Sequence, residues 1–485
     1  MRGWCQILCL SALTLTIAAQ QPSPGEAEAI QALRAQRYEE ALASLEGLLQ
    51  RHPNDPRLWT LRGMALSGLG RPAQSIASYE EALKRQSDYL PALQGAADVE
   101  FRTGRPQARE RLERIVLLEP DNRTAQAMLG ELAYRRRDCP VAVRYFDKSG
   151  DAVEADPVVL RHYAHCLFVV RRPAEAAPAF RRLVSLRPDD DALRYNLGLS
   201  LFEAGRHTEA AETLLPLVSE SQPEPDVLSL LADAQRAALD TPGAVATLQK
   251  SIRLYPRGER FYLQLAELCM EHSSYDLGLE VTEIGVKNLP DSSSILTMHG
   301  ILLAQLGFYE KAEAAFEQAA FLDPGEQAAT LSLSLTLQRT GRVEESIDVL
   351  RDRVRNSPED EVAAFFLGQA LIRKGITPKD EEFVEARSAL ERSAAALPNE
   401  ASPRVELGKL YLKEGQVQRA IEVLGEAVEL APSNRRATYQ LMIALRRAGR
   451  NKEAADLASQ VRQQLQRDKQ DEVRRNRYRL VKSEP

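Results

Sequence analysis

The residues best suited to chemistry stand together in the pentapeptide HYAHC, residues 162–166. His162, His165 and Cys166 fall within one helical turn, and Cys139 precedes Cys166 in the chain. Such residues could ligate a metal ion, form a disulfide, or simply be buried, since free cysteine behaves as a small hydrophobic residue. The CxxC and HExxH spacings of metal sites are absent. Unlinked buried cysteines are therefore the ordinary interpretation, and the disulfide and the metal site stay open as alternatives.

These residues lie in a chain that repeats itself, with a period of about 34 residues. One position of the repeat holds a small residue: Gly63, Ala97, Gly130, Ala164, Gly198, Ala232, Ala266, Gly300, Ser334, Gly368 and Gly408. A later turn position is usually glycine: Gly70, Gly104, Gly205, Gly307, Gly341, Gly375, Gly415 and Gly449. An alanine follows the turn, and a proline stands near the end of each repeat, as at Ala210 and Pro223. Four kinds of residue that recur with the same period indicate an array of similar units.

Each register has a physical explanation. Apolar residues at helical spacing, as in LTMHGILLAQLG (residues 296–307), predict two helices in every repeat, so the chain is all α. The turn glycine can adopt positive φ and end the first helix. The small residue and the alanine are expected to face one another where the two helices pack. The proline ends the second helix, and the residue directly after it is expected to cap the next first helix, as with Asp121, Asp189, Asp291 and Ser433.

A few repeats depart from the pattern. Larger residues replace the turn glycine at Arg137, Arg171, Leu239 and Ser273. Pro178 and Pro216 fall inside second helices, where each is expected to kink the helix or shift its start. The segment ITPKDE, residues 376–381, is an insertion at one turn and is expected to form a loop.

The pattern resembles that of the tetratricopeptide repeat family. The family's spacing is carried by YNLGLSLFEAGRHTEAAETL (195–214), HGILLAQLGFYEKAEAAFEQAAFLDP (299–324) and VELGKLYLKEGQVQRAIEVLGEAVELAP (405–432). The resemblance implies an all-α, right-handed superhelical solenoid over residues 20–466, in which each repeat buries its apolar faces against its neighbours. We expect 13 repeats, which start near residues 22, 56, 90, 123, 157, 191, 225, 259, 293, 327, 361, 401 and 435.

The two ends of the chain differ from the array. Residues 1–19 place Arg2 before the apolar run 7–19, which is typical of a secretory signal peptide and too short for the ~20 residues that span a membrane. We expect cleavage, export to the periplasm or beyond, and no membrane span afterwards; a retained anchor is the alternative. Residues 467–485 form a basic tail, expected to extend a solvating capping helix or, alternatively, to contact an anionic surface. The net charge of −6 gives no reason to expect nucleic acid as a partner.

The resemblance bears on the cysteines as well. In a stacked array of this kind, the start of one second helix lies beside the end of the following first helix. Cys139 and Cys166 occupy such positions in consecutive repeats, which makes them a candidate disulfide that an exported location would favour. Cys269 is expected to be a small buried hydrophobic residue.

The resemblance also implies that certain first-helix positions line a concave groove, where partners of the family bind. One such position, read along four consecutive repeats, holds Phe101, Tyr134, Phe168 and Phe202. Interleaved groove positions hold Arg102, Glu131, Arg135, Arg161, His165 and Tyr195. Aromatic and arginine side chains can offer flat apolar contacts and pair with carboxylates of an extended peptide. Alternatively, the aromatic residues, which are common at this position in the family, pack only on their neighbours.

Two groove specificities of the family are not matched. The carboxylate-gripping repeats use lysines around an asparagine, and here Asn196 matches that asparagine without the lysines. The family's glycosyltransferases carry a ladder of asparagines at the same position. The equivalent positions here hold other residues: His162, Leu230, Gln264 and Met298.

The repeats use nearly all of the chain, so no stretch is left for a separate catalytic domain. Phosphate-binding loops, nucleophile elbows and metalloprotease motifs are absent from the sequence, and we expect neither an enzyme nor a bound cofactor or metal. The predicted function is a non-enzymatic, exported scaffold that binds a protein or peptide in its groove, for assembly of an envelope or secretion complex. The alternative is a polysaccharide-guiding component of an exopolysaccharide export apparatus, because aromatic side chains also stack on sugars.

Overall fold

The computed structural model describes residues 24–219, 222–459, 462 and 466. Within these residues every regular element is a helix. The chain divides into an N-terminal unit, residues 1–247, and a C-terminal unit, residues 248–485. The predicted signal peptide (1–19) and basic tail (467–485) lie outside the described residues, so both stay predictions.

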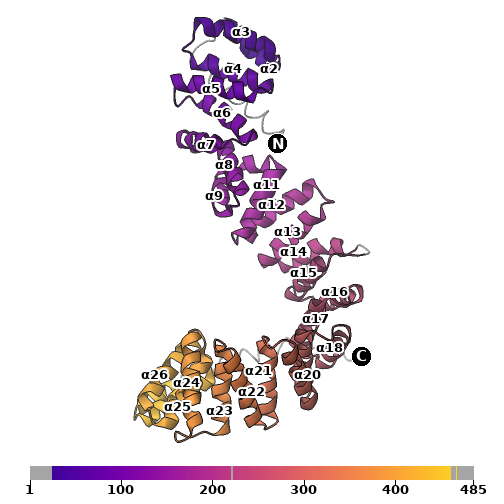
Figure 1. The fold of residues 1–485 in the computed structure, drawn as a ribbon, viewed down its shortest axis with the longest axis vertical. Coiled ribbons are helices and arrows are strands. Elements are labelled where there is room, and N and C mark those ends of the chain that lie inside the picture. Colours follow the sequence, from indigo (N-terminus) through magenta and orange to yellow (C-terminus); the bar gives the residue numbers. More distant parts are fainter. Residues whose placement is uncertain (1–23, 220–221, 460–461, 463–465, 467–485) are drawn as a thin grey trace. The chain divides into compact units, whose positions relative to one another are not determined.

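The N-terminal unit is a succession of helical hairpins (Figure 1). Its helices are α2 (Pro24–Arg34), α3 (Tyr38–Arg51), α4 (Pro56–Gly68), α5 (Pro72–Arg85), α6 (Leu90–Arg102), α7 (Gln107–Leu118), α8 (Arg123–Arg135), α9 (Cys139–Ser149), α10 (Asp151–Glu154), α11 (Pro157–Val169), α12 (Pro173–Leu186), α13 (Asp191–Glu203), α14 (His207–Leu214), the 3₁₀ helix η1 (Leu215–Val218) and α15 (Pro225–Ala237). The next helix, α16 (Thr241–Leu254), contains the boundary between the units.

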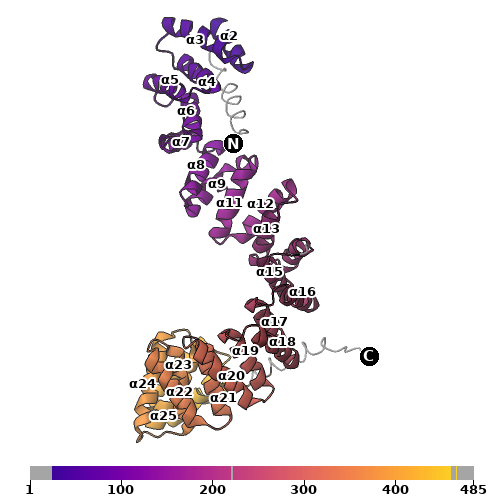
Figure 2. The same cartoon turned by 45° about the vertical axis from the view of Figure 1, so that its right-hand side comes forward.

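The C-terminal unit continues the same alternation, and α21 to α25 pack side by side (Figure 1 and Figure 2). Its helices are α17 (Glu259–Glu271), α18 (Tyr275–Asn288), α19 (Ser293–Gln305), α20 (Tyr309–Leu322), α21 (Gln327–Arg339), α22 (Val343–Asn356), α23 (Glu361–Lys374), α24 (Glu381–Ala396), α25 (Ala401–Glu414), α26 (Val417–Leu430) and α27 (Arg435–Arg447). Residues 451–459 are also helical.

The first helices of the repeats begin at or very near the starts expected from the sequence. From α2 to α15 and from α17 to α27, consecutive first and second helices pack against one another. Several consecutive first helices also contact one another, among them α4 with α6, α8 with α11, and α19 with α21. In each unit the first helices therefore share one face, which we call the inner face.

The two helices of a repeat approach closely because a glycine of the first makes room for a large side chain of the second. A Cβ added to Gly130 would lie 2.5 Å from the Phe146 ring, and one added to Gly300 would lie 2.5 Å from the Phe316 ring. Phe146 and Phe316 are buried. The expected facing residue, the alanine, is thus only part of the contact: the large residue one turn after it fills the space opposite the glycine.

The turn between the two helices keeps one backbone conformation even where glycine is missing. Gly70, Gly205 and Gly307 adopt φ of 70°, 75° and 87°. The residues that replace glycine also have positive φ, at 61° for Arg137, 62° for Arg171, 63° for Leu239, 56° for Ser273 and 58° for Gln36. Side chains other than glycine adopt this left-handed region at a cost of roughly 1–2 kcal/mol per residue. Packing of the two helices therefore imposes the turn.

Leu239→Gly is accordingly expected to stabilise the N-terminal unit. Leu239 is 88% exposed, so the change removes little packing. Relief of the strained φ outweighs the extra freedom of glycine in the unfolded chain, for a net gain of about 0.5–1 kcal/mol. Thermal unfolding followed by circular dichroism measures the effect. Gly205→Leu is the matched reverse change, at a turn with open space around the glycine, and should lower the midpoint. A lower midpoint for Leu239→Gly would show that the turn carries no such strain.

Four first helices, α8, α13, α19 and α27, are capped one residue later than the sequence pattern predicts. The side chains that accept the capping hydrogen bond belong to Asn122, Asp190, Ser292 and Asn434, and the expected Asp121, Asp189, Asp291 and Ser433 precede them. The expectation that the residue directly after the proline caps the next helix was wrong, because that residue belongs to the turn and the cap is the residue after it. In several repeats the proline carbonyl is also bonded, because a side chain of the following first helix donates to it, as Trp59 does to Pro53 and Tyr262 to Pro256.

The irregular repeats are accommodated locally. α14 ends at Leu214 and gives way to η1, because Pro216 has no N–H to continue the helix. The change to a 3₁₀ helix differs from the kink or shifted start that was expected at Pro216. α12 begins at Pro173, as its pattern requires, and runs through Pro178 to Leu186. Residues 375–380 form the expected loop, held by buried Ile376, whose carbonyl accepts a hydrogen bond from Lys413 at 3.2 Å.

Candidate functional site

The aromatic row predicted from the sequence occupies one equivalent position on four successive first helices of the N-terminal unit. Phe101, Tyr134, Phe168 and Phe202 stand in the last turn of α6, α8, α11 and α13. Each ring is partly buried and packs against neighbouring core residues. Part of each side chain therefore stabilises the repeat, and part remains accessible.

Arg135 links the first two repeats of this row. Its guanidinium lies over the Phe101 ring, 4.7 Å from the ring centroid, in a cation–π contact between α8 and α6. Its Nε donates a hydrogen bond of 3.0 Å to Oε1 of Glu131, one turn earlier on α8. The guanidinium is thus fixed between a ring and a carboxylate, while the side chain as a whole stays partly exposed.

Glu131 connects the row to the next repeat. Its carboxylate is largely buried, and Oε2 lies 2.6 Å from Nδ1 of His162 on α11. Because a carboxylate can only accept, His162 donates through Nδ1, which leaves Nε2 for another partner. The His162 ring stacks on Tyr134 with centroids 4.0 Å apart and planes 14° from parallel, and exposed His165 meets Tyr134 edge-on at 6.1 Å.

These contacts join residues of three successive first helices into one group, which we call the inner-face cluster: Phe101, Glu131, Tyr134, Arg135, His162 and His165. His162 is its centre and is absent from the groove residues predicted from the sequence. The available signal was its place one repeat before Asn196, at a position that faces the groove in the family. The residue type did not indicate a groove role, because the family's ladder at this position consists of asparagines and His162 does not match it.

The other predicted groove residues include Arg102, Phe168 and Phe202. Arg102 donates to Asp98 at 3.0 Å and to Ser67 of α4 at 2.9 Å. Burial raises the pKa of Asp98, and the Arg102 charge opposes that rise. Phe202 meets His207 of its own repeat, with ring centroids 5.2 Å apart. Phe168 packs at the edge of the core without a ring contact among the described residues.

Arg161 and Tyr195 complete the predicted set. Arg161 lies on α11, one residue before His162, and its side chain is exposed. Within the part of the chain that the structure describes, Arg161 forms no ion pair, in contrast to Arg102 and Arg135. Tyr195 is partly buried on α13. Arg161 is thus a cation of the inner face whose charge is not already matched by a carboxylate among the described residues.

The structure joins Cys139 and Cys166 in a disulfide, with Cα atoms 4.9 Å apart. Cys139 is the first residue of α9, and Cys166 lies on α11 one turn after His162. The bond ties the second helix of one repeat to the first helix of the next, and it differs from the ordinary interpretation of unlinked thiols. Among the described residues, no group of three or more His, Cys, Asp or Glu side chains is placed to hold a metal ion. Cys269 is buried and unbonded, and burial raises the pKa of its thiol.

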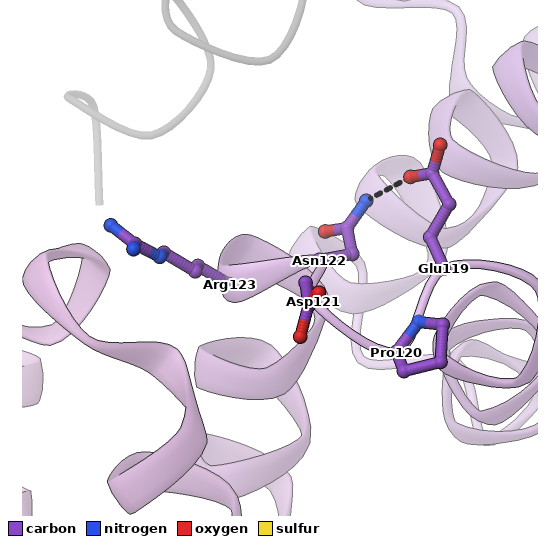
Figure 3. Close-up of a pocket in the computed structure, with 5 residues that line it drawn as sticks. All are labelled: Glu119, Pro120, Asp121, Asn122 and Arg123. Carbon is purple, nitrogen blue, oxygen red and sulfur yellow. Dashed lines mark hydrogen bonds between the residues drawn. The ribbon is translucent and has the colours of Figure 1, made fainter.

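A surface hollow of about 500 Å³ lies at the loop between α7 and α8 (Figure 3). Its lining is a single run of the chain, Glu119 to Arg123. The Asn122 side chain donates to Glu119 at 2.9 Å and accepts from the N–H of Ala125, so both ends of its amide are used. Arg123 points away from Pro120 and pairs with Asp151 at 2.7 Å.

Three models described as tetratricopeptide repeats match the chain. One matches residues 26–91, 61–108, 95–157, 167–225 and 297–361, more than half of the chain, and the others match 226–257 and 411–471.

Individual relatives are distant. The chain is 25% identical over 438 residues to cellulose synthase 2 operon protein C of Komagataeibacter xylinus, covering 88% of this chain and 31% of that protein. It is 28% identical over 207 residues to cellulose synthase operon protein C of Xanthomonas axonopodis pv. citri (strain 306), covering 42% and 12%. It is 23% identical over 169 residues to the BBS4 homologue of the BBSome complex of Drosophila melanogaster, covering 34% and 35%. The chain thus spans about a third of the length of the first and third of these relatives.

The solved structures that the chain matches include yeast Tom70, with a TM-score of 0.41 and 15% identity over 95% of this chain and 96% of that one. Another is the Cut9–Hcn1 hetero-tetramer of the APC/C, with a TM-score of 0.39 and 13% identity over 90% and 99%. The helical hairpins, their glycine-lined contacts and turns, and the family models that match most of the chain agree. This chain belongs to the tetratricopeptide repeat family.

Proposed function

We propose that this chain is a non-enzymatic scaffold that holds an extended segment of a protein partner along the inner face of the N-terminal unit. The observation that carries the proposal is the inner-face cluster, which runs unbroken from Phe101 on α6 to His165 on α11. Aromatic rings and arginines are the side chains most often responsible for binding energy at protein interfaces. Their positions are already held by one another, so little conformational freedom is lost when a partner binds.

The chemistry of the cluster favours a peptide that carries carboxylates. Arg161 offers an exposed guanidinium, and fixed Arg135 has N–H groups beyond the one it gives to Glu131. The acids nearby, Asp98 and Glu131, are each paired with an arginine, which reduces their repulsion of an acidic segment. The bonds that Glu131 makes to Arg135 and His162 support a positioning role for this carboxylate and argue against its use as a general base.

Export is part of the proposal. It is supported by the apolar segment 7–19 after Arg2 and by the likeness to the cellulose synthase operon proteins of two bacteria. The searched helices, all within the described residues, include none with the length and apolar character to cross a bilayer. We propose that the mature chain works in the periplasm or outside the cell, in assembly of an envelope or secretion complex.

A second candidate function is guidance of a polysaccharide during its export. The specific observation in its favour is the 25% identity over 438 residues to cellulose synthase 2 operon protein C. The partly exposed side chains of Phe101, Tyr134, Phe168 and Phe202 also support it, because aromatic faces stack on sugar rings as well as on peptides.

The experiment selects peptides from a random display library on the immobilised mature chain and titrates the enriched sequences. We expect acidic peptides to be enriched. A variant with Phe101, Tyr134, Phe168 and Phe202 all changed to Ser should bind them at least about tenfold more weakly, since the hot spots of an interface each contribute about 2 kcal/mol or more. Arg161→Glu tests the same site with a single exposed substitution, which leaves the packing of the repeats unchanged.

Tyr439→Ser is the control, because Tyr439 is an exposed aromatic residue of the C-terminal unit. It should leave peptide affinity unchanged. Equal binding by the wild type and both inner-face variants would contradict the proposed site. Cello-oligosaccharides titrated in parallel separate the two functions: affinity for oligosaccharide that the Ser variant loses, without enrichment of any peptide, would favour polysaccharide guidance.

A further inference from the structure

The C-terminal unit carries a second surface that the proposed function does not use. A cleft of about 400 Å³ lies where α18, α19 and α20 meet. Its walls are mostly apolar: Leu279, Val286, Leu296, Leu303, Phe308, Ala314 and Ala315. Four polar side chains complete the lining: Glu283, His299, Lys311 and Gln318. The cleft opens between two second helices, on the side away from the inner face.

An exposed aromatic side chain stands beside the cleft. Phe321 is 84% exposed and lies two helical turns beyond Ala314 on the same side of α20. Phe308, at the other end of the cleft, is 50% exposed. Large apolar side chains that gather around a concavity on a water-soluble surface usually mark an interaction site. The cleft and Phe321 together form one surface, which we call the patch. It contains a projecting ring next to a hollow.

The charges of the patch are of opposite sign and lie on opposite walls. Glu283 projects from α18 and Lys311 from α20, with His299 of α19 between them. Burial lowers the pKa of His299, whose Nδ1 lies 3.0 Å from the Thr282 hydroxyl, and the charges of Glu283 and Lys311 act on it in opposite directions. Among the described residues, neither Glu283 nor Lys311 has an ion-pair partner, and the Lys311 ammonium lies over the Phe308 ring at 5.7 Å.

We propose that the cleft is covered by the same patch of a second copy of this chain. In a two-fold symmetric dimer one surface must be complementary to itself. This patch meets that requirement twice: Phe321 of each copy faces the cleft of the other, and Lys311 of each copy faces Glu283 of the other. Such a dimer would present two inner faces, and binding to a partner with repeated segments would gain from having both.

Sedimentation equilibrium of the full mature chain tests the proposal. We expect a mass twice that of the chain at micromolar concentrations. Phe321→Ser should raise the dimer dissociation constant at least tenfold, and Tyr439→Ser, which removes an exposed ring elsewhere in the same unit, should leave it unchanged. A wild type that stays monomeric up to about 100 μM, or a dimer indifferent to Phe321→Ser, overturns the proposal.

A charge exchange identifies the contact itself. Lys311→Glu and Glu283→Lys are each expected to weaken the dimer, because each places like charges opposite one another twice. The double variant should dimerise again with nearly the wild-type dissociation constant. Both side chains are exposed, so none of the three variants should alter the helix content. Failure of the double variant to recover would show that these charges do not meet across the two-fold axis.

Discussion

Replacement of Gly300 by leucine is expected to lower the thermal unfolding midpoint of the C-terminal unit strongly. Even a Cβ at this position would lie 2.5 Å from the Phe316 ring, and that ring is 1% exposed. Three further carbon atoms cannot be fitted unless α19 and α20 move apart. Overpacking of a well-packed core typically costs 1–3 kcal/mol and occasionally more, and we expect about 3 kcal/mol here.

Gly425→Leu is the matched control. Gly425 also lies inside a helix of the C-terminal unit, α26, but a Cβ there would have nothing within 4 Å. Leucine is a better helix former than glycine by roughly 0.5–1 kcal/mol, so this change should raise the midpoint slightly. Thermal unfolding of the two variants, followed by circular dichroism at 222 nm, compares them directly. Equal midpoints would mean that the small-residue register does not mark the helix contact.

Loss of the Cys139–Cys166 disulfide is expected to have the largest effect in the N-terminal unit. The bond closes a loop with a sequence separation of 27 residues. By the chain-entropy argument, a crosslink over that length stabilises the folded state by roughly 3–4 kcal/mol. A reductant, or replacement of both cysteines by alanine, should therefore lower the unfolding midpoint of this unit by several degrees.

Titration of thiols in denaturant shows whether the bond is present in the isolated protein. In the mature chain, from which Cys5 and Cys9 are expected to be removed, reduction should raise the number of reactive thiols by two. In the Cys139→Ala/Cys166→Ala variant, reduction should change neither the count nor the midpoint. Cys269→Ala is the matched control, because Cys269 is buried and unbonded, and this variant should keep the response to reductant. A wild-type count that reductant does not change would contradict the bond.

The disulfide also bears on the inner-face cluster. Cys166 lies on α11 one residue after His165 and one turn after His162. The bond anchors this part of α11 to α9, which follows α8, the helix that carries Glu131, Tyr134 and Arg135. The affinity of the proposed peptide site should therefore fall together with the unfolding midpoint when the bond is reduced.

Much of the fold could be predicted because it depends on short-range rules. A small residue, a turn glycine, an alanine and a proline at a constant spacing give the start of each first helix almost to the residue. The same rules failed where one residue decides the geometry. Asn122, and not Asp121, caps α8, because the turn after the proline needs one more residue than the pattern alone reveals. Leu239 adopts a glycine-like φ of 63°, because the packing of two helices outweighs its local preference.

The amino-acid sequence by itself determined the class of fold, the repeat boundaries and the row of aromatic residues, since each follows from a constant period that local helix chemistry repeats. Only the tertiary structure decided which side chains meet. Arg135 lies on Phe101, Glu131 bonds to His162, and Cys139 is joined to Cys166, each pair coming from two consecutive repeats. Such contacts depend on the rotation and spacing of successive helices and on side-chain rotamers. Packing between repeats sets the rotation, the spacing and the rotamers, so the sequence of one repeat does not determine them.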